Sequence, residues 1–159
     1  MSPGRSWRAI LVGGLTVGVL DGLDALIFFG MRGARPMRIF QTIAGGLIGT
    51  TAAFQGGRWT AALGVVCHFT VAFAIVTTYW LLSRRWPALA ERPWFYGPLY
   101  GIAAYGVMTF VVVPLSALSL TLPRPAPLIN GLLIHIFGVG LPSALAARWA
   151  YRARHESRR

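Results

Sequence analysis

The chain alternates between long apolar stretches and short polar segments that are rich in arginine. Apolar residues dominate five segments, at residues 9–29, 39–55, 59–82, 95–120 and 128–149. A helix needs about 20 residues to cross roughly 30 Å of hydrocarbon. The pattern therefore predicts an all-α integral membrane protein. We expect a single domain over residues 1–159, a bundle of four to five transmembrane helices with a basic cytoplasmic tail at residues 150–159.

The second stretch, residues 39–55, decides between four and five spans. It is the shortest of the five and contains Gln41 and several threonines. Gly45 and Gly49 share a helix face with Gln41, at the small-xxx-small spacing through which membrane helices approach closely. The stretch lacks the charged face that is typical of a helix lying on a membrane surface. The pattern favours a packed transmembrane helix over a re-entrant or interfacial one.

Composition favours a membrane protein over a soluble one. Hydrophobic residues make up 55% of the chain and charged residues only 12%, whereas soluble domains carry about 25% charged residues. The net charge of +11 comes from arginines that flank the apolar stretches. This placement is typical of membrane flanks and argues against a nucleic-acid surface. The arginine-rich tail, residues 148–159, is expected to lie against anionic lipid headgroups.

The arginines also predict how the chain lies in a bacterial inner membrane. With either four or five spans, the linker at residues 83–93 and the C-terminus are placed in the cytoplasm by the positive-inside rule. The side of the N-terminus depends on residues 39–55, because one additional span reverses it. The arginine distribution barely separates those two arrangements.

Two aspartates and two histidines lie inside the apolar stretches. Asp21 and Asp24 are half of the four acidic residues, and both fall in the first stretch. An ionisable group in hydrocarbon costs roughly 3 kcal/mol even on the lenient insertion scale, and such groups usually mark a functional site. Counting about 1.5 Å per residue along each helix predicts that His68 and His135 share one level in the outer half of the membrane. We expect these four residues, together with Tyr105 and Asn130, to form an intramembrane polar site.

Several interpretations of this site stay open. The carboxylates and imidazoles could pass protons, since histidine titrates near neutral pH. His68, His135 and Asp21 could instead ligate a divalent metal, or the two histidines could hold one haem. In a purely structural interpretation, Asp21 is hydrogen-bonded across helices to His68, Tyr105 or Asn130 and merely fastens an oligomerising bundle.

The leading interpretation is a membrane protein, not an enzyme, that handles protons or a small solute, or that acts as an accessory subunit of a membrane complex. A metal- or haem-binding redox protein is the alternative, although no cofactor is favoured. The one cysteine, Cys67, excludes an internal disulfide and a cysteine-based metal motif. Motifs for nucleotide binding or nucleophilic catalysis are absent from the sequence.

Other residues are expected to shape the helices. Pro114 and Pro142 fall inside the fourth and fifth stretches, where proline removes a backbone hydrogen bond and usually kinks a helix. Gly97, Gly101 and Tyr105 follow one another at four-residue intervals. This spacing predicts close helix packing rather than a pore.

Four blocks of the sequence carry a family resemblance: VLDGLDALIF, RIFQTIAGGLIGTTAAFQGGRWTAALGVVCHF, GPLYGIAAYGVMTFVVVPLSA and LLIHIFGVGLPSALAAR. Together they cover most of the chain, which resembles a family of small bacterial inner-membrane proteins of uncharacterised activity. The resemblance implies that Asp21, His68, His135 and the Pro114-Leu115-Ser116 motif match family positions, as does the glycine-rich segment at residues 44–49. Asp24 lies outside that pattern. The resemblance implies a membrane location and no particular activity.

Overall fold

The computed structural model describes residues 3–118 and 124–156, without the side chains of residues 3–5 and 153–156. These residues are almost entirely helical and contain no β-strand. The elements are, in order, α1 (Pro3–Gly30), α2 (Pro36–Ile48), α3 (Thr50–Gln55), α4 (Gly57–Arg85), α5 (Ala88–Glu91), α6 (Pro93–Val107), the π-helix η1 (Met108–Val112), α7 (Val113–Leu115), α8 (Pro125–Ile134), the π-helix η2 (His135–Gly140) and α9 (Leu141–Glu156).

Within the described residues, four helical segments are long and apolar enough to cross a membrane. They are Ser6–Gly30, Gly57–Arg85, Pro93–Leu115 and Pro125–Arg152. The all-α prediction is therefore confirmed, and the number of candidate spans is the lower of the two expected. The fourth stretch ends earlier than predicted, at Leu115, and residues 119 and 120 of that prediction lie outside the described residues. The basic tail continues α9 to Glu156, and residues 157–159 also lie outside them.

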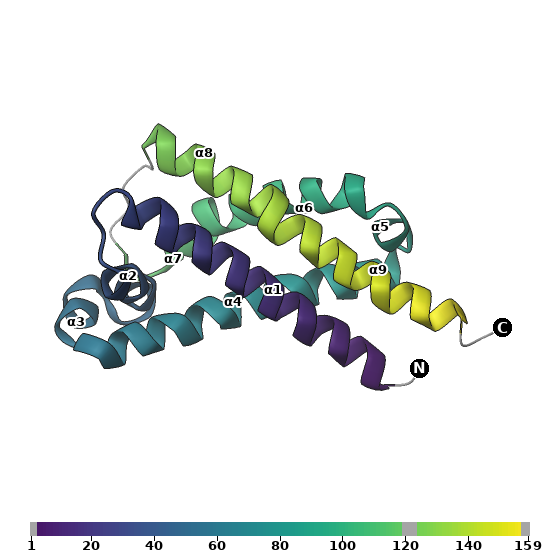
Figure 1. Cartoon of the computed structure of the whole chain (residues 1–159), viewed down its shortest axis with the longest axis horizontal. Coiled ribbons are helices and arrows are strands. Elements are labelled where there is room, and N and C mark those ends of the chain that lie inside the picture. Colours follow the sequence, from purple (N-terminus) through teal and green to yellow (C-terminus); the bar gives the residue numbers. More distant parts are fainter. Residues whose placement is uncertain (1–2, 119–123, 157–159) are drawn as a thin grey trace.

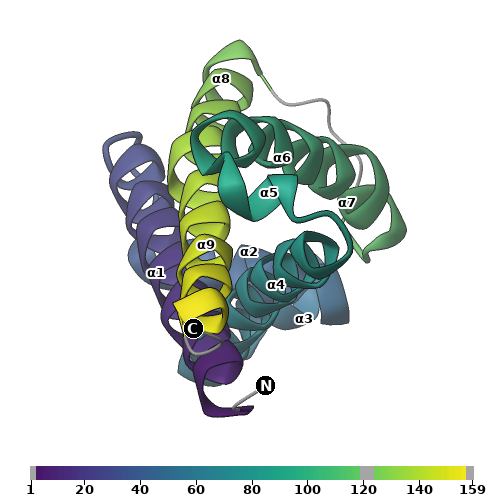
Figure 2. The same ribbon diagram turned by 90° about the vertical axis from the view of Figure 1, so that its right-hand side faces the viewer.

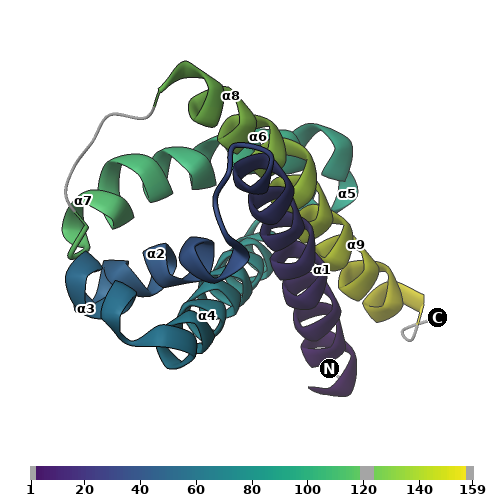
Figure 3. The same cartoon turned by 60° about the vertical axis from the view of Figure 1, so that its left-hand side comes forward.

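The four long segments run side by side, and both chain termini lie at one end of the bundle together with α5 (Figure 1). The end of α1, the helices α2 and α3, and the start of α8 lie at the opposite end, as a rotated view confirms (Figure 3). Seen from the terminal end, α9 lies between α1 and α6 (Figure 2). We call the two ends the terminal end and the α2–α3 end.

The apolar core is formed mainly by alanine and valine side chains, with Tyr79 as its one large member among the buried residues of the two clusters. One buried cluster joins α1, α4 and η2 through Val17, Ala72, Val76 and Val139. A second cluster lies nearer the terminal end and contains Tyr79, Ala144 and Ala147. The hydroxyl of Tyr79 donates a hydrogen bond of 2.9 Å to the carbonyl of Leu89, so α4 is tied to α5. Small residues at these positions let the helices approach closely.

Glycines permit the closest backbone contacts. A Cβ atom added to Gly64 would collide with the backbone of α2. One added to Gly101 would collide with the carbonyl of His135, and one added to Gly140 would collide with the carbonyl of Gly97. Close packing through Gly97 and Gly101 is thus confirmed, and its partner is the π-helical stretch η2.

The single transmembrane helix expected over residues 39–55 is wrong. Helix α2 ends at Ile48, and Gly49 takes φ +82° before α3 begins at Thr50. Glycine adopts such a positive φ readily because it has no Cβ atom. The 13 residues of α2 extend only about 20 Å, short of the roughly 30 Å of a hydrocarbon core.

The two glycines expected to form a packing face behave differently. A Cβ atom on Gly49 would meet no atom within 4 Å, so this glycine breaks the helix and packs against nothing. Gly45 is buried, and its added Cβ atom would lie 3.3 Å from Leu118 of the same chain. Gln41 is fully buried as well, and its amide donates a hydrogen bond of 2.9 Å to the carbonyl of Gly57, which ties α2 to α4.

Each proline expected to kink a helix follows a π-helical stretch. Pro114 is the second residue after η1, and Pro142 is the second residue after η2. The ring of a proline inside a helix clashes with the carbonyl one turn earlier. The wider π-helical turn relieves this clash, and the backbone N–H of Leu141 correspondingly bonds to the carbonyl of Ile136, five residues back. The consequence for function is that His135, the first residue of η2, lies on an irregular turn.

Candidate functional site

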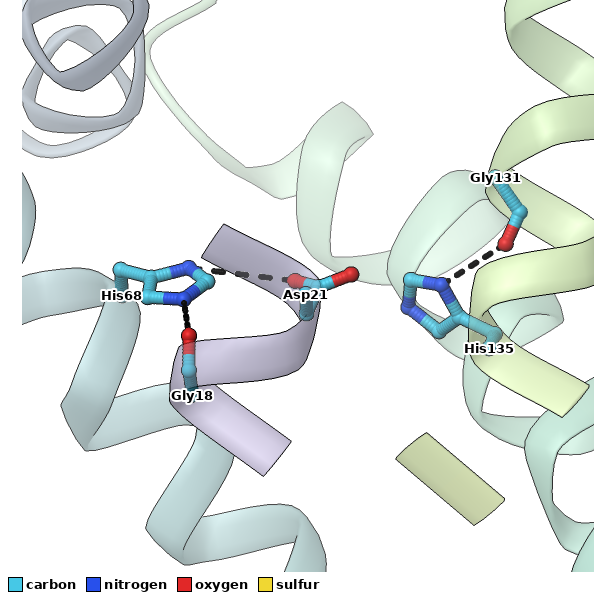
Figure 4. A network of polar contacts seen from close by, with 5 residues as sticks. All are labelled: Gly18, Asp21, His68, Gly131 and His135. Carbon is cyan, nitrogen blue, oxygen red and sulfur yellow. Dashed lines mark hydrogen bonds and ion pairs between the residues drawn. The ribbon is translucent and has the colours of Figure 1, made fainter. Parts of the chain in front are cut away.

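The polar residues predicted from the sequence lie at one level of the bundle. Asp21 is on α1, His68 on α4 and His135 at the start of η2. Counted from the segment boundaries at the α2–α3 end, all three lie about 14 to 17 Å along their helices. The structure therefore brings together three residues that are far apart in the chain (Figure 4).

His68 is held by the backbone of α1. Its Nε2 atom lies 2.8 Å from the carbonyl oxygen of Gly18. Because a carbonyl oxygen only accepts hydrogen bonds, Nε2 must carry the proton, and in the neutral ring Nδ1 is then an acceptor. Nδ1 faces Oδ2 of Asp21 at 3.9 Å, which is too long for a hydrogen bond. The side chain of His68 is only 10% exposed, whereas that of Asp21 is 28% exposed.

His135 is held in the same way by its own helix. Its Nδ1 atom lies 2.9 Å from the carbonyl oxygen of Gly131 and donates to it. Nε2 of the neutral ring is therefore an acceptor too. The ring of Tyr105 on α6 stacks against it at a tilt, with the ring centroids 5.1 Å apart. In the view of Figure 4, the side chain of Asp21 is drawn between those of His68 and His135.

Asp24 lies one turn closer to the α2–α3 end and has a different partner. The side-chain amide of Asn130 on α8 donates a hydrogen bond of 2.6 Å to Oδ2 of Asp24. Asp24 also interacts electrostatically with Asp21 and His135. All six predicted site residues thus fall in one region, but Asn130 pairs with Asp24 and not with Asp21.

The next layer toward the terminal end is apolar. Val17 lies four residues before Asp21, and Ala72 and Val139 lie four residues after the two histidines. These three side chains belong to one buried cluster and are at most 2% exposed. One helical turn therefore separates the polar layer from a dry layer across three elements.

The sequence analysis missed a stripe of glycines that positions His68. Gly14, Gly18 and Gly22 follow at four-residue spacing on α1. Cβ atoms on the first two would overlap phenylalanine rings of α4, and one on Gly22 would lie 3.2 Å from Nε2 of His68. The stripe forms the surface against which this part of α4 packs. Its spacing is visible in the sequence and is the signal that would have found it.

The described residues do not assemble a metal-ion site here. No group of three or more His, Cys, Asp or Glu side chains within the described ranges 3–118 and 124–156 is placed to hold a metal ion. The candidate set of His68, His135 and Asp21 is therefore not assembled as a metal site.

Comparisons with protein-family models, with curated proteins and with solved structures found no match. The resemblance to small bacterial inner-membrane proteins stays a prediction. The chemistry of the site is therefore argued from its own geometry.

Replacing Asn130 by leucine is expected to destabilise the bundle. The variant removes the donor to Asp24 and leaves that carboxylate without its partner on α8. Interhelical hydrogen bonds of this kind contribute about 0.6 to 1.7 kcal/mol in membrane proteins, so a lower melting temperature in detergent is expected by circular dichroism.

A double-mutant cycle with Asp24→Ala and Asn130→Ala isolates this pair. The two changes should be less than additive, because either one alone already breaks the bond. Thr70→Val is the matched control, since this exposed hydroxyl bonds only to the carbonyl of Val66 in its own helix. Additive effects of the two alanine variants would show that the contact contributes nothing.

Proposed function

We propose that this chain is a multi-pass protein of the bacterial inner membrane that handles protons at Asp21. The four apolar segments support a membrane location. An even number of spans places both termini on one side, and the arginines at residues 84–92 and 148–159 favour the cytoplasm for that side. The α2–α3 end then faces the periplasm.

One observation carries the proposal, namely that Nδ1 of neutral His68 and the carboxylate of Asp21, which face each other at 3.9 Å, both accept hydrogen bonds. The carbonyls of Gly18 and Gly131 each take up one imidazole N–H. The remaining nitrogens of neutral His68 and His135 are acceptors, and so is the ionised carboxylate of Asp21. These three groups have no donor directed at one another, and the smallest species that supplies one is a proton.

The apolar surroundings of the site strengthen the need for a proton there. An ionised carboxylate in a helical bundle within hydrocarbon is costly unless it has a partner or is neutralised. The contact of Asp21 with His68 is long, at 3.9 Å. Histidine is the side chain that gains and loses a proton near neutral pH. Protonation of the set is therefore favourable, and the proton can reside on the carboxyl or on either imidazole.

Exchange of this proton is expected from the α2–α3 end. The dry layer of Val17, Ala72 and Val139 separates Asp21 from the terminal end. Release of the proton to the opposite side then requires a second conformation, as in any carrier whose site opens alternately.

The experiment is a measurement of proton flux in proteoliposomes. Purified protein is reconstituted with a pH-sensitive dye in the lumen, and a potassium diffusion potential drives proton entry. The wild type should acidify the lumen faster than empty liposomes. Asp21→Asn should fall to the rate of empty liposomes, because asparagine keeps the size of the side chain but cannot take up the proton.

Glu91→Gln is the control, because it removes an exposed carboxylate from α5 and should leave the flux unchanged. Equal stability of the two variants in detergent ensures that the loss does not come from unfolding. Undiminished flux in Asp21→Asn, or flux no faster than that of empty liposomes for the wild type, would refute the proposal.

A further inference from the structure

The surface of the α2–α3 end is strongly positive. Its exposed arginines are Arg32, Arg35, Arg38, Arg58 and Arg124. Among the described side chains, Glu91 lies at the terminal end, and Asp24 lies six residues before the end of α1, which is about 9 Å along the helix. None of these arginines forms an ion pair within the described residues. A surface with such an excess of one charge attracts partners of the opposite charge.

Three of these arginines rest on aromatic rings. The guanidinium carbon lies 3.6 Å from the ring centroid of Phe28 in Arg32, 4.5 Å from that of Phe54 in Arg38, and 5.5 Å from that of Trp59 in Arg58. Distances of up to about 6 Å are typical of cation–π contacts. Tryptophan gathers at the boundary between membrane and water, and Trp59 is 74% exposed. These arginines are therefore expected at the level of the lipid headgroups.

Backbone contacts orient two of the three further. Nη1 of Arg32 donates a hydrogen bond of 2.9 Å to the carbonyl of Phe28, in the last turn of α1. Nη1 of Arg38 donates a longer one, of 3.5 Å, to the carbonyl of Phe54 near the end of α3. A guanidinium has five N–H groups, so most of them stay accessible on these exposed side chains. Because the side chains are already oriented, binding an anion costs them less conformational entropy.

Apolar side chains are exposed among the arginines. Leu47 on α2 is 66% exposed and Phe54 on α3 is 37% exposed, whereas Ile39, Ala44 and Ala53 of the same two helices are buried. Exposed leucine and aromatic side chains beside arginines are typical of segments that lie in the headgroup region. An anion in water would contact the arginines alone. A lipid contacts both the arginines and the apolar side chains.

We infer that the α2–α3 end is a docking surface for anionic phospholipids. Their phosphates bind the arginines, since a guanidinium can donate two parallel hydrogen bonds to one phosphate, and their acyl chains cover the exposed apolar side chains of α2 and α3. Phosphatidylglycerol is favoured over phosphatidylcholine, because choline brings a further positive charge to a surface that is already positive. This surface is separate from the arginines of α9, which lie at the opposite end (Figure 1). The inference does not depend on the proposed proton chemistry.

The experiment measures which lipid lies against α3. Gln55→Cys, in a Cys67→Ser background, is labelled with a fluorophore and reconstituted into liposomes. In one set, phosphatidylglycerol with a nitroxide quencher on its acyl chain is diluted in phosphatidylcholine. In the other set, phosphatidylcholine with the same quencher is diluted to the same fraction in phosphatidylglycerol. We expect the quenching to show a preference for phosphatidylglycerol of about fivefold or more, the factor that one arginine near an anionic surface contributes.

Two triple variants test whether the arginines of this end are responsible. Replacing the three ring-stacked arginines by glutamine, in Arg32→Gln, Arg38→Gln and Arg58→Gln, should remove most of the preference. The matched control removes the same charge at the terminal end, in Arg84→Gln, Arg85→Gln and Arg92→Gln. Arg84 is also stacked on a ring, with its guanidinium carbon 5.0 Å from the centroid of Trp80. The control should keep the preference measured at Gln55→Cys.

Three results would overturn the inference. Equal quenching by the two lipids would show that this end does not distinguish headgroups, and this comparison needs no arginine variant. An equal loss in the two triple variants would show an effect of net charge and not of this surface. Loss of the preference in inorganic phosphate at constant ionic strength would show a site for free anions. The proton-flux assay is independent of all three, so either proposal can fail without the other.

Discussion

Replacement of Gly101 by valine is expected to abolish the folded bundle. A Cβ atom at this position would collide with the carbonyl of His135 and lie 2.8 Å from Cα of Ile136. These are backbone atoms, which cannot turn aside as the end of a flexible side chain can. Overpacking a core by extra methylenes typically costs about 1 to 3 kcal/mol, and a backbone collision is expected to exceed that range. The yield of monodisperse protein in size-exclusion chromatography is the measurement.

Gly106 supplies a matched control on the same helix. A Cβ atom there would meet nothing within 4 Å, so Gly106→Val should be recovered at close to wild-type yield and melting temperature. Both variants carry the same change of volume and of helix propensity in α6. Similar behaviour of the two would mean that the contact between α6 and η2 does not hold the bundle together.

The long helices could be predicted from the sequence because their signal is local. The first and third apolar stretches, residues 9–29 and 59–82, fall inside α1 and α4. A run of apolar residues long enough to cross a membrane can be recognised from composition alone, whatever the helix packs against. The ends of the helices differ from the prediction: α4 begins at Gly57 and extends to Arg85, through a last turn that contains Arg84 and Arg85.

The break at Gly49 could not be predicted in the same way. A glycine that packs against a neighbouring helix and a glycine that ends a helix produce the same spacing in the sequence. The difference lies in a contact made far along the chain, where the backbone N–H of Ala117 donates to the carbonyl of Gly46 over 2.9 Å. That contact fixes the end of α2, and no periodicity within residues 39–55 reveals it.

The sequence pointed to the polar residues inside the apolar helices but not to their pairing. Ionisable residues in apolar helices are rare enough to be found by inspection. Their partners depend on how each helix is rotated, and the hydrogen bond between Asp24 and Asn130 joins residues 106 positions apart. The two imidazoles become acceptors because their N–H groups bond to the backbone carbonyls of Gly18 and Gly131. Backbone contacts of this kind cannot be predicted from a side-chain motif.

Single cysteines placed before and after α2 and α3 are expected to react from the same side of the membrane. Met31 is 82% exposed just after α1, and Gln55 is exposed at the end of α3. Because α2 and α3 are too short to cross and are separated by the break at Gly49, both positions lie at the α2–α3 end. Met31→Cys and Gln55→Cys, each in a Cys67→Ser background, should be labelled in intact cells by an impermeant maleimide.

Ala88→Cys in α5 is the matched control, since it lies at the terminal end and is exposed. It should react only after the membrane is permeabilised. Labelling of Gln55→Cys alone in intact cells would mean that residues 31–55 cross the membrane, and it would reverse the N-terminus. An odd number of spans would also carry α2 past the level of Asp21. The one-sided access argued for the proton site therefore depends on the same experiment that counts the spans.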